Sequence, residues 1–419
     1  MTRLPFFVTL LVTLCSQAAE NSNFYLKAGD RVVFYGDSIT DQRLYTTFTE
    51  TYVVTRFPKM DVTFVHSGWG GDRVTGGGGG DIDTRLKRDV FAYKPTVMTI
   101  MLGMNDASYK VFDQGVFKTY TNGYEHIIAS LKQNLPDLRL TLIRPSPFDD
   151  VTRPPKFEGG YNAVLVRYGD FVQELASQNG ATVADLNAGV VATVTKAHAK
   201  DPEMSIKLNE DRVHPGPAGQ LLMANELLKA WKAPSVVSDV SIDASSKRAD
   251  ARQATVSNLK TDGKISWTQL DSALPFPMST NDPVMALAIS SSDVMDALNK
   301  ETLRVTGLEA ESYKLRIDGT NVATFSRDDL SKGINLARFS TPMMRQAGQV
   351  HALTVQHNDL HFKRWREIQV PLLDHKNPKI AAVIPSLIEA LDEEEVEVVK
   401  KQRQTAQPKP RQFELVPVN

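Results

Sequence analysis

Short apolar runs alternate with longer amphipathic stretches through the first half of the chain. In the stretches 120–135 and 161–178, apolar residues recur at the spacing of one helix face. Strands that alternate with helices form parallel sheets, because each crossover helix returns the chain to the same edge of the sheet. We therefore predict an α/β domain over 24–233, with helices on both faces of a central parallel sheet. Its five expected strands are rich in β-branched residues and span 31–35, 62–65, 97–102, 138–143 and 182–186.

The pattern changes beyond residue 234, where short alternating segments predominate. Residues 236–242 alternate between apolar and polar, and 317–322 contain an Asp-Gly turn that is typical of a hairpin. Residues 350–356 are predicted as a further strand and 327–337 as a helix. We assign 235–375 to a β-rich accessory domain, which could bind carbohydrate, shape a substrate cleft or only pad the molecule. Its aromatic residues are more typical of a core than of a ligand platform: Trp267, Phe276, Tyr313, Phe339 and Trp365.

The last segment, 376–419, has a charged composition of its own. Residues 385–404 predict a helix in which acidic residues precede basic ones, an order that suits the helix dipole. Pro408 and Pro410 follow this helix. We expect a charged helix and a disordered tail.

The first nineteen residues are typical of a secretory signal peptide. Arg3 is followed by an apolar run over 4–14 that is too short to cross a bilayer, and small residues follow over 16–19. Cleavage of 1–19 predicts a secreted or periplasmic protein without stable membrane insertion. Leu14 stands before Cys15, where a lipoprotein would need a small residue, so anchoring at Cys15 is disfavoured.

The rest of the composition narrows the classes of function. Cys15 is the only cysteine, so the cleaved chain would lack disulfides, cysteine nucleophiles and zinc–thiolate sites. Hydrophobic residues make up 42% of the chain, which excludes intrinsic disorder and a small disulfide scaffold. Lys and Arg number 48 against 49 Asp and Glu, a balance that does not predict a nucleic-acid partner.

Two short motifs follow the first two predicted strands. Ser38, in Gly-Asp-Ser, would present its hydroxyl at the end of a strand, although Asp37 or Ser38 could instead cap a helix. Gly71, near the end of Gly-Trp-Gly-Gly-Asp, could point a backbone N–H at an oxyanion, or form only a tight turn. Trp69 in the same motif would stack on a sugar ring or pack under the glycine loop. The five glycines 76–80 form a mobile lip or a plain flexible loop, and they do not match a phosphate-binding P-loop.

Two further motifs supply the remaining chemistry of a hydrolase. Asn105, in Gly-Met-Asn-Asp, carries an uncharged amide that can donate to an oxyanion. Asp211 and His214, three residues apart, can fold so that the carboxylate orients the imidazole, which then accepts a serine proton. Each motif is weak alone. Together, each after a strand or after the last crossover, they provide a nucleophile, a base, an orienting acid and oxyanion donors.

The four motifs, in this order, resemble the blocks of the SGNH or GDSL-type esterase and lipase superfamily, over about residues 30–232. The resemblance implies a flavodoxin-like three-layer α/β/α fold and hydrolysis of esters without a metal or another cofactor. It implies Ser38 as nucleophile, Asp211 and His214 as the rest of the triad, and Ser38, Gly71 and Asn105 as the oxyanion hole. One departure is His66, where many relatives have Asn, and it concerns support of the loop more than the chemistry.

We thus expect a secreted serine ester hydrolase that releases short acyl groups, such as acetate, from carbohydrate. Its substrate would be a small-molecule or polysaccharide ester. The same fold also allows a lipolytic esterase or thioesterase. A classical α/β-hydrolase does not fit, because Thr40 stands where its nucleophile motif needs glycine. The complete set of motifs disfavours a non-catalytic binding protein.

A two-metal phosphoesterase is the rival from another class. Metal pairs of this kind favour oxygen and imidazole ligands. Only two of the histidines lie near the predicted strand ends, which disfavours this alternative. The candidate ligands are Asp37, His66, Asp72, Asp106, Asp211 and His214.

Overall fold

A computed structural model describes residues 23–372 and 374–418. The predicted signal peptide and Cys15 lie outside these residues. Within the part of the chain that is described, none of the helices combines the length and the apolar character needed to span a bilayer.

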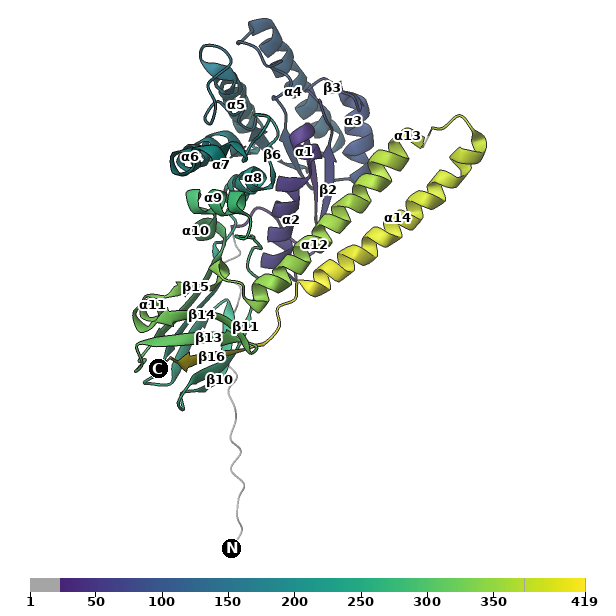
Figure 1. Cartoon of the computed structure of the whole chain (residues 1–419). Coiled ribbons are helices and arrows are strands. Elements are labelled where there is room, and N and C mark those ends of the chain that lie inside the picture. The colour runs from purple at the N-terminus through teal and green to yellow at the C-terminus, as the bar shows by residue number, and fades with distance from the viewer. Residues whose placement is uncertain (1–22, 373, 419) are drawn as a thin grey trace.

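A five-stranded parallel sheet forms the centre of the first domain (Figure 1). All five predicted strands are present, and every residue of the third is buried. The strand order is β2-β1-β5-β6-β7, the flavodoxin-like order in which ligands bind beyond the carboxyl ends of the strands. The strands are β1 (Asp30–Gly36), β2 (Val62–Gly68), β5 (Val97–Met101), β6 (Arg139–Arg144) and β7 (Thr182–Asp185).

Helices cover both faces of this sheet and complete the predicted three-layer α/β/α fold. The fifth helix begins and ends within one residue of the expected bounds 161–178, because its apolar residues follow one buried stripe, whereas the fourth begins six residues before the expected 120. Helix α2 packs against α8 and α8 against α6, while α4 packs against α5. The helices are α1 (Ser38–Asp41), α2 (Leu44–Arg56), α3 (Ile82–Asp89), α4 (Gln114–Asn134), α5 (Gly160–Asn179), α6 (Leu186–Lys200), α7 (Pro202–Ile206) and α8 (Pro217–Ala230). A 3₁₀ turn (Phe91–Tyr93) and a small hairpin of β3 (Gly76–Gly77) and β4 (Gly80–Asp81) lie between α2 and β5.

Two further sheets form a second domain with its own core. Their orders are β10-β11-β16-β13-β14 and β15-β12-β8-β9. Trp267 and Phe413 stack in this core with ring centroids 5.0 Å apart. The strands are β8 (Val236–Asp243), β9 (Arg248–Arg252), β10 (Ala254–Lys260), β11 (Ile265–Asp271), β12 (Lys300–Thr306), β13 (Ser312–Ile317), β14 (Thr320–Ser326), β15 (Ile334–Asn335) and β16 (Arg411–Pro417). Short helices α9 (Pro283–Ser291), α10 (Val294–Leu298) and α11 (Arg327–Lys332) and a 3₁₀ turn (Leu336–Arg338) connect them.

The structure corrects three predictions in the second half of the chain. The strand predicted over 350–356 is wrong, because these residues lie within helix α12 (Pro342–Phe362), where Val350 and Thr354 are buried four residues apart on one face. The helix predicted over 327–337 ends at Lys332, and Gly333 leads into β15. The disordered tail is also wrong. After Pro410 the chain forms β16, which pairs with β11 on one side and β13 on the other.

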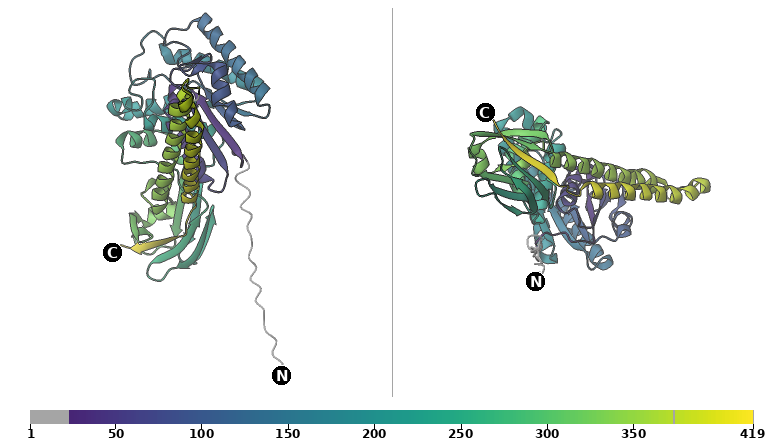
Figure 2. Two further views of the ribbon diagram at one scale, coloured as in Figure 1. Left: turned by 90° about the vertical axis from the view of Figure 1, so that its right-hand side faces the viewer. Right: turned by 90° about the horizontal axis from the view of Figure 1, so that it is seen from below.

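A long helical hairpin links the second domain back to the first. Helix α12 continues through a π-helical stretch (Lys363–Gln369) and α13 (Val370–Leu372), and α14 (Pro378–Thr405) returns beside it. The helix predicted over 385–404 lies within α14. Helix α12 contacts α2 and β2 of the first domain. Figures 1 and 2 show the hairpin lying along the α/β domain, with the end that joins α13 and α14 projecting beyond it.

Candidate active site

Ser38 lies where β1 ends and α1 begins. The Asp37 carboxylate caps this helix by accepting a hydrogen bond from the Ile39 N–H at 3.0 Å, so the capping alternative applies to Asp37. Gly36 is required here, because a Cβ would overlap the Thr40 side chain and lie 2.7 Å from the Met101 carbonyl oxygen. Burial raises the pKa of Asp37 to about 7. The Ser38 hydroxyl is left at the carboxyl edge of the sheet, half-buried.

His214 joins Ser38 to Asp211 through a continuous chain of hydrogen bonds. Its Nε2 lies 2.7 Å from Ser38 Oγ, and its Nδ1 lies 2.6 Å from Asp211 Oδ2. The other oxygen of Asp211 accepts the backbone N–H groups of Val213 and His214 at 2.8 and 2.7 Å. Partial burial alone would raise the pKa of Asp211, but these hydrogen bonds lower it below its usual value. Since an ionised carboxylate only accepts, His214 Nδ1 is the donor, and Nε2 is free to accept the serine hydroxyl.

The loop after β2 is held against α1 by hydrogen bonds. The Gly70 N–H donates to Asp41 Oδ2 at 3.2 Å, and the Trp69 N–H donates to the Gly36 carbonyl at 3.0 Å. The next residue, Gly71, is exposed and has φ +78°, a left-handed conformation that favours glycine. The loop ends at Asp72, whose carboxylate accepts from Arg85 Nε at 2.7 Å.

Asn105, after β5, lies against the same loop. Its Nδ2 donates to the Asp72 carbonyl at 3.1 Å, and its Oδ1 accepts from the Tyr109 hydroxyl at 3.0 Å. The neighbouring Asp106 is buried and accepts the Val74 N–H at 2.9 Å, and burial raises its pKa to about 7. The structure thus brings the loops after β1, β2 and β5 together, with Asp211 and His214 beside them.

A family model for GDSL-like lipases and acylhydrolases matches residues 34–222, the part of the chain that contains all of these loops. The α/β domain belongs to the GDSL-like lipase/acylhydrolase family. The chain is accordingly a carboxylic ester hydrolase.

Two known proteins are similar to this chain. An acetylxylan esterase of Geobacillus stearothermophilus is 26% identical over 227 residues, which are 48% of this chain and 94% of that protein. The solved structure of a gut microbial diltiazem-metabolizing enzyme is 29% identical, with a TM-score of 0.81 over 94% of this chain and 98% of that one. The second likeness therefore includes the accessory sheets and the hairpin as well as the GDSL-like domain.

In this GDSL-like domain, three of the acidic residues considered as metal ligands each have a different protein partner. Asp37 caps α1, Asp72 pairs with Arg85, and Asp106 accepts from Val74. In the described ranges, no three potential ligand side chains form a group suited to a metal ion. The groups that the structure brings together at Ser38 are a hydroxyl, an imidazole and a carboxylate.

Trp69 is packed under the glycine hairpin, as one of the two alternatives predicted. Its side chain is buried, with the Arg366 guanidinium over its face and the Trp365 ring meeting it edge-on at 5.7 Å. A Cβ on Gly79 would lie 2.6 Å from the Trp69 ring. Both Trp365 and Arg366 come from the C-terminal hairpin, a contact that sequence motifs around residue 69 do not signal.

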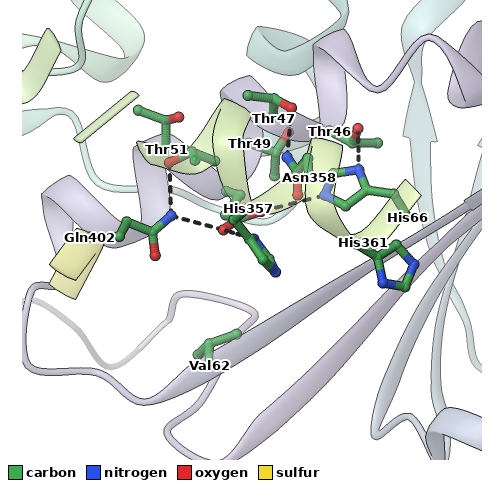
Figure 3. A network of polar contacts seen from close by, with 12 residues as sticks. Thr46, Thr47, Thr49, Thr51, Val62, His66, His357, Asn358, His361 and Gln402 are labelled. Carbon is green, nitrogen blue, oxygen red and sulfur yellow. Dashed lines mark hydrogen bonds and ion pairs between the residues drawn. The ribbon is translucent and has the colours of Figure 1, made fainter. Parts of the chain in front are cut away.

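His66 is a support residue, in a buried network that joins α2 and β2 to the hairpin (Figure 3). Its Nδ1 lies 2.7 Å from Thr46 Oγ1, and its Nε2 lies 3.4 Å from Glu50. Glu50 also contacts His357 Nδ1 at 3.1 Å, and His357 Nε2 lies 3.0 Å from Glu395. Burial lowers the pKa of His66, so it remains neutral between these partners.

Proposed function

We propose that this esterase acts through an acyl-enzyme, with Ser38 as nucleophile, His214 as general base and acid, and Asp211 as the orienting carboxylate. The observation that carries the proposal is the unbroken hydrogen-bonded chain from Asp211 through His214 to Ser38. This arrangement is the one that serine hydrolases on unrelated folds share.

In the proposed mechanism, His214 Nε2 removes the Ser38 proton as Oγ attacks the ester carbonyl. The resulting imidazolium donates from Nδ1 to Asp211, which stays ionised. Collapse of the tetrahedral intermediate breaks the bond to the alcohol, and His214 gives that alcohol its proton. A water molecule then attacks the acyl-Ser38 by the same route, which releases the acid and restores the free serine.

Three donors would stabilise the oxyanion: the N–H groups of Ser38 and Gly71 and the Nδ2 amide of Asn105. The hydrogen bonds that fix Gly70 to α1 and Asn105 to Asp72 support this assignment, because preorganised donors cost no reorganisation during the reaction. No metal or other cofactor takes part in the proposal.

We propose short acyl groups on carbohydrate, acetate above all, as the substrate class. The likeness to a protein named as an acetylxylan esterase supports this class, since 94% of that protein aligns with the GDSL-like half of this chain. The expected signal peptide over 1–19 would place the enzyme outside the cytoplasm, where polysaccharides are met.

Chemical inhibition tests the reaction class. A fluorophosphonate should abolish hydrolysis of 4-nitrophenyl acetate and label the peptide that contains Ser38, while a strong chelator should leave the rate unchanged. Ser130→Ala on α4 is the control that keeps both activity and labelling. Loss of activity with the chelator and resistance to the fluorophosphonate would overturn the proposal.

An acyl-chain series tests the substrate class. Turnover should fall from acetate through butyrate to octanoate esters, and acetylated xylan should release acetate. A preference for octanoate would replace the carbohydrate substrate with a lipid one while leaving the triad in place.

A further inference from the structure

Tyr109 has a left-handed backbone conformation, which is uncommon for a residue with a side chain. Ser108 and Tyr109 both have φ +57°, so two consecutive residues with side chains lie in the left-handed region. This region costs free energy for any residue with a Cβ, and such costs gather at functional sites. The conformation directs the Tyr109 side chain back toward Asn105, four residues earlier.

The phenol hydroxyl holds one end of the Asn105 amide. It donates to Asn105 Oδ1 at 3.0 Å, while Asn105 Nδ2 donates one of its two hydrogens to the Asp72 carbonyl at 3.1 Å. The amide is therefore fixed in one orientation, and its second N–H hydrogen is not used by either bond. Burial of the phenol and the negative charges of Asp37 and Asp211 raise the pKa of Tyr109 to about 12, so the hydroxyl keeps its proton at neutral pH.

The ring of Tyr109 packs against other aromatic rings but remains partly exposed. It packs on Tyr161, with centroids 5.0 Å apart, and near Phe148 at 6.3 Å. Tyr161 is itself fixed, because its hydroxyl donates to the Met104 carbonyl at 2.5 Å. Even so, 42% of the Tyr109 surface is exposed. An aromatic ring that is held by its neighbours, on a residue that is 42% exposed, is available to a substrate beside the proposed oxyanion donor.

From these contacts we propose that Tyr109 is a positioning and specificity residue of the esterase. Its hydroxyl orients the Asn105 amide for the oxyanion, and its open ring face binds the alcohol part of the ester, preferring a ring such as a pyranose. The inference rests on the proposed function. When the acyl group is acetate, the alcohol is the only part of the ester large enough to cover an aromatic face.

The test for the hydroxyl is a double-mutant cycle with Asn105. Tyr109→Phe keeps the ring and should lower kcat about five- to tenfold with KM unchanged, the effect of one lost hydrogen bond. In an Asn105→Ala background, the same change should have no further effect, because the amide it orients is gone. Tyr25→Phe removes a phenol that donates to Leu140 at the amino edge of the sheet, and it should leave kcat unchanged.

The test for the ring compares two acetate esters. Tyr109→Gly removes the ring and relieves the left-handed strain, so this variant keeps the fold. Its KM should rise about tenfold for an acetylated xylose, which matches the loss of a well-packed aromatic contact, and stay unchanged for ethyl acetate. Equal changes for both esters would overturn the specificity role.

The failures of the two proposals are distinguishable. If Asn105→Ala alone retains the wild-type rate, the oxyanion assignment in the proposed function is wrong. If Asn105→Ala is impaired but Tyr109→Phe lowers kcat equally in both backgrounds, or not at all, only the positioning role of the Tyr109 hydroxyl is overturned.

Discussion

Single residues decide how the site is built, and Gly71 is the clearest example. A Cβ on Gly71 would meet nothing within 4 Å, yet its φ of +78° is unfavourable for any other residue. The need for glycine is therefore conformational, and it concerns the direction of one N–H group. Gly180 has a similar φ of +64° and equal space, but it caps helix α5 far along the chain from the proposed oxyanion hole.

Gly71→Ala and Gly180→Ala should each lower the free energy of unfolding by about 1 kcal/mol, since both place alanine in the left-handed region. Only Gly71→Ala should lower kcat, by about 10²–10³-fold, because it disturbs an oxyanion donor. Urea unfolding and steady-state kinetics on 4-nitrophenyl acetate measure the two effects. Equal kinetics for the two variants would remove Gly71 from the oxyanion hole.

The sequence predicts which residues form the candidate site better than it predicts the residues that contact them. Ser38 and Asn105 are recognisable because each follows a strand that local composition reveals, and His214 because it follows the last crossover in an Asp-x-x-His motif. The contact of Tyr109 with Asn105 was not predicted, because the local amino-acid sequence does not indicate two consecutive residues in the left-handed conformation. The roles of the five site residues stay predictions until their variants are measured.

At the scale of elements, ion pairs of His357 connect the hairpin of α12 and α14 to helix α2. Burial alone would lower the pKa of His357, but the facing carboxylates of Glu50 and Glu395 raise it to about 10. Burial of Glu50 is likewise outweighed by His357, which lowers the pKa of that carboxylate. His66 and His361 beside them have lowered pKa values because of burial, and Gln402 donates to Glu50 at 3.0 Å. His357 is thus the cation between the buried carboxylate of Glu50 and the partly buried carboxylate of Glu395.

His357→Gln should lower the free energy of unfolding by about 3–5 kcal/mol near neutral pH, because the buried carboxylate of Glu50 and the partly buried one of Glu395 lose their counter-ion. The pKa of His357 is raised on folding, so its contribution is full below the unfolded value of about 6.5 and is lost as pH rises through about 10. Urea unfolding of wild type and variant at about pH 6 and about pH 10.5 measures this. His126→Gln, on an exposed pair with Asp83, is the control with little effect. A difference that is constant across this range would contradict a charged His357.

Alanine substitutions at one glycine in α4 and one in α12 should change the stability of the fold in opposite directions. A Cβ on Gly348 would meet nothing within 4 Å, whereas one on Gly123 would lie 2.6 Å from Val74 Cγ2. Gly348→Ala should stabilise the chain by about 0.5–1 kcal/mol through helix propensity. Gly123→Ala should destabilise it by about 1–3 kcal/mol through overpacking. Thermal unfolding compares them, and a shift of the same sign in both variants would contradict the packing.

Across the whole molecule, the accessory sheets and the candidate site lie at different ends. Figure 1 shows α1 at one end of the parallel sheet and the strands around β16 beyond the other. The contacts agree, because Arg56, at the end of α2 and before β2 begins, donates to the Val236 carbonyl of β8 at 2.9 Å. The helical hairpin does reach the loop after β2, because Arg366 of the hairpin lies over the ring of Trp69 in that loop. We therefore expect the accessory sheets not to shape the substrate cleft, which is one of the three roles predicted for them.

Local sequence could not reveal this long-range arrangement. β16 lies in the middle of its sheet, yet its partners in β11 and β13 are about a hundred or more residues earlier, and two prolines precede it. In α12, alternation over 350–356 imitated a strand, while Val350 and Thr354 followed a helix face. Strands of the first domain were predictable because most neighbours in the sheet follow one crossover helix apart, the exception being β1 and β5, which have β2 between them in the chain.

Phe413→Ala should lower the free energy of unfolding by about 3–5 kcal/mol, because it opens a cavity beside Trp267. At temperatures where the variant is folded, kcat should equal that of wild type, since β16 is remote from Ser38. Val418→Ala, at a side chain that is 40% exposed, is the matched control. A lower kcat in folded Phe413→Ala would connect the sheets with catalysis.

The central claim is that Ser38 carries the acyl group during turnover. The most direct measurement is mass spectrometry of the enzyme, acid-quenched while it hydrolyses an excess of an acetate ester. We predict one acetyl group on the peptide that contains Ser38, and neither acetyl group nor turnover in folded Ser38→Ala. Turnover by Ser38→Ala at the wild-type rate, or an acetyl group on a different residue, would contradict the account.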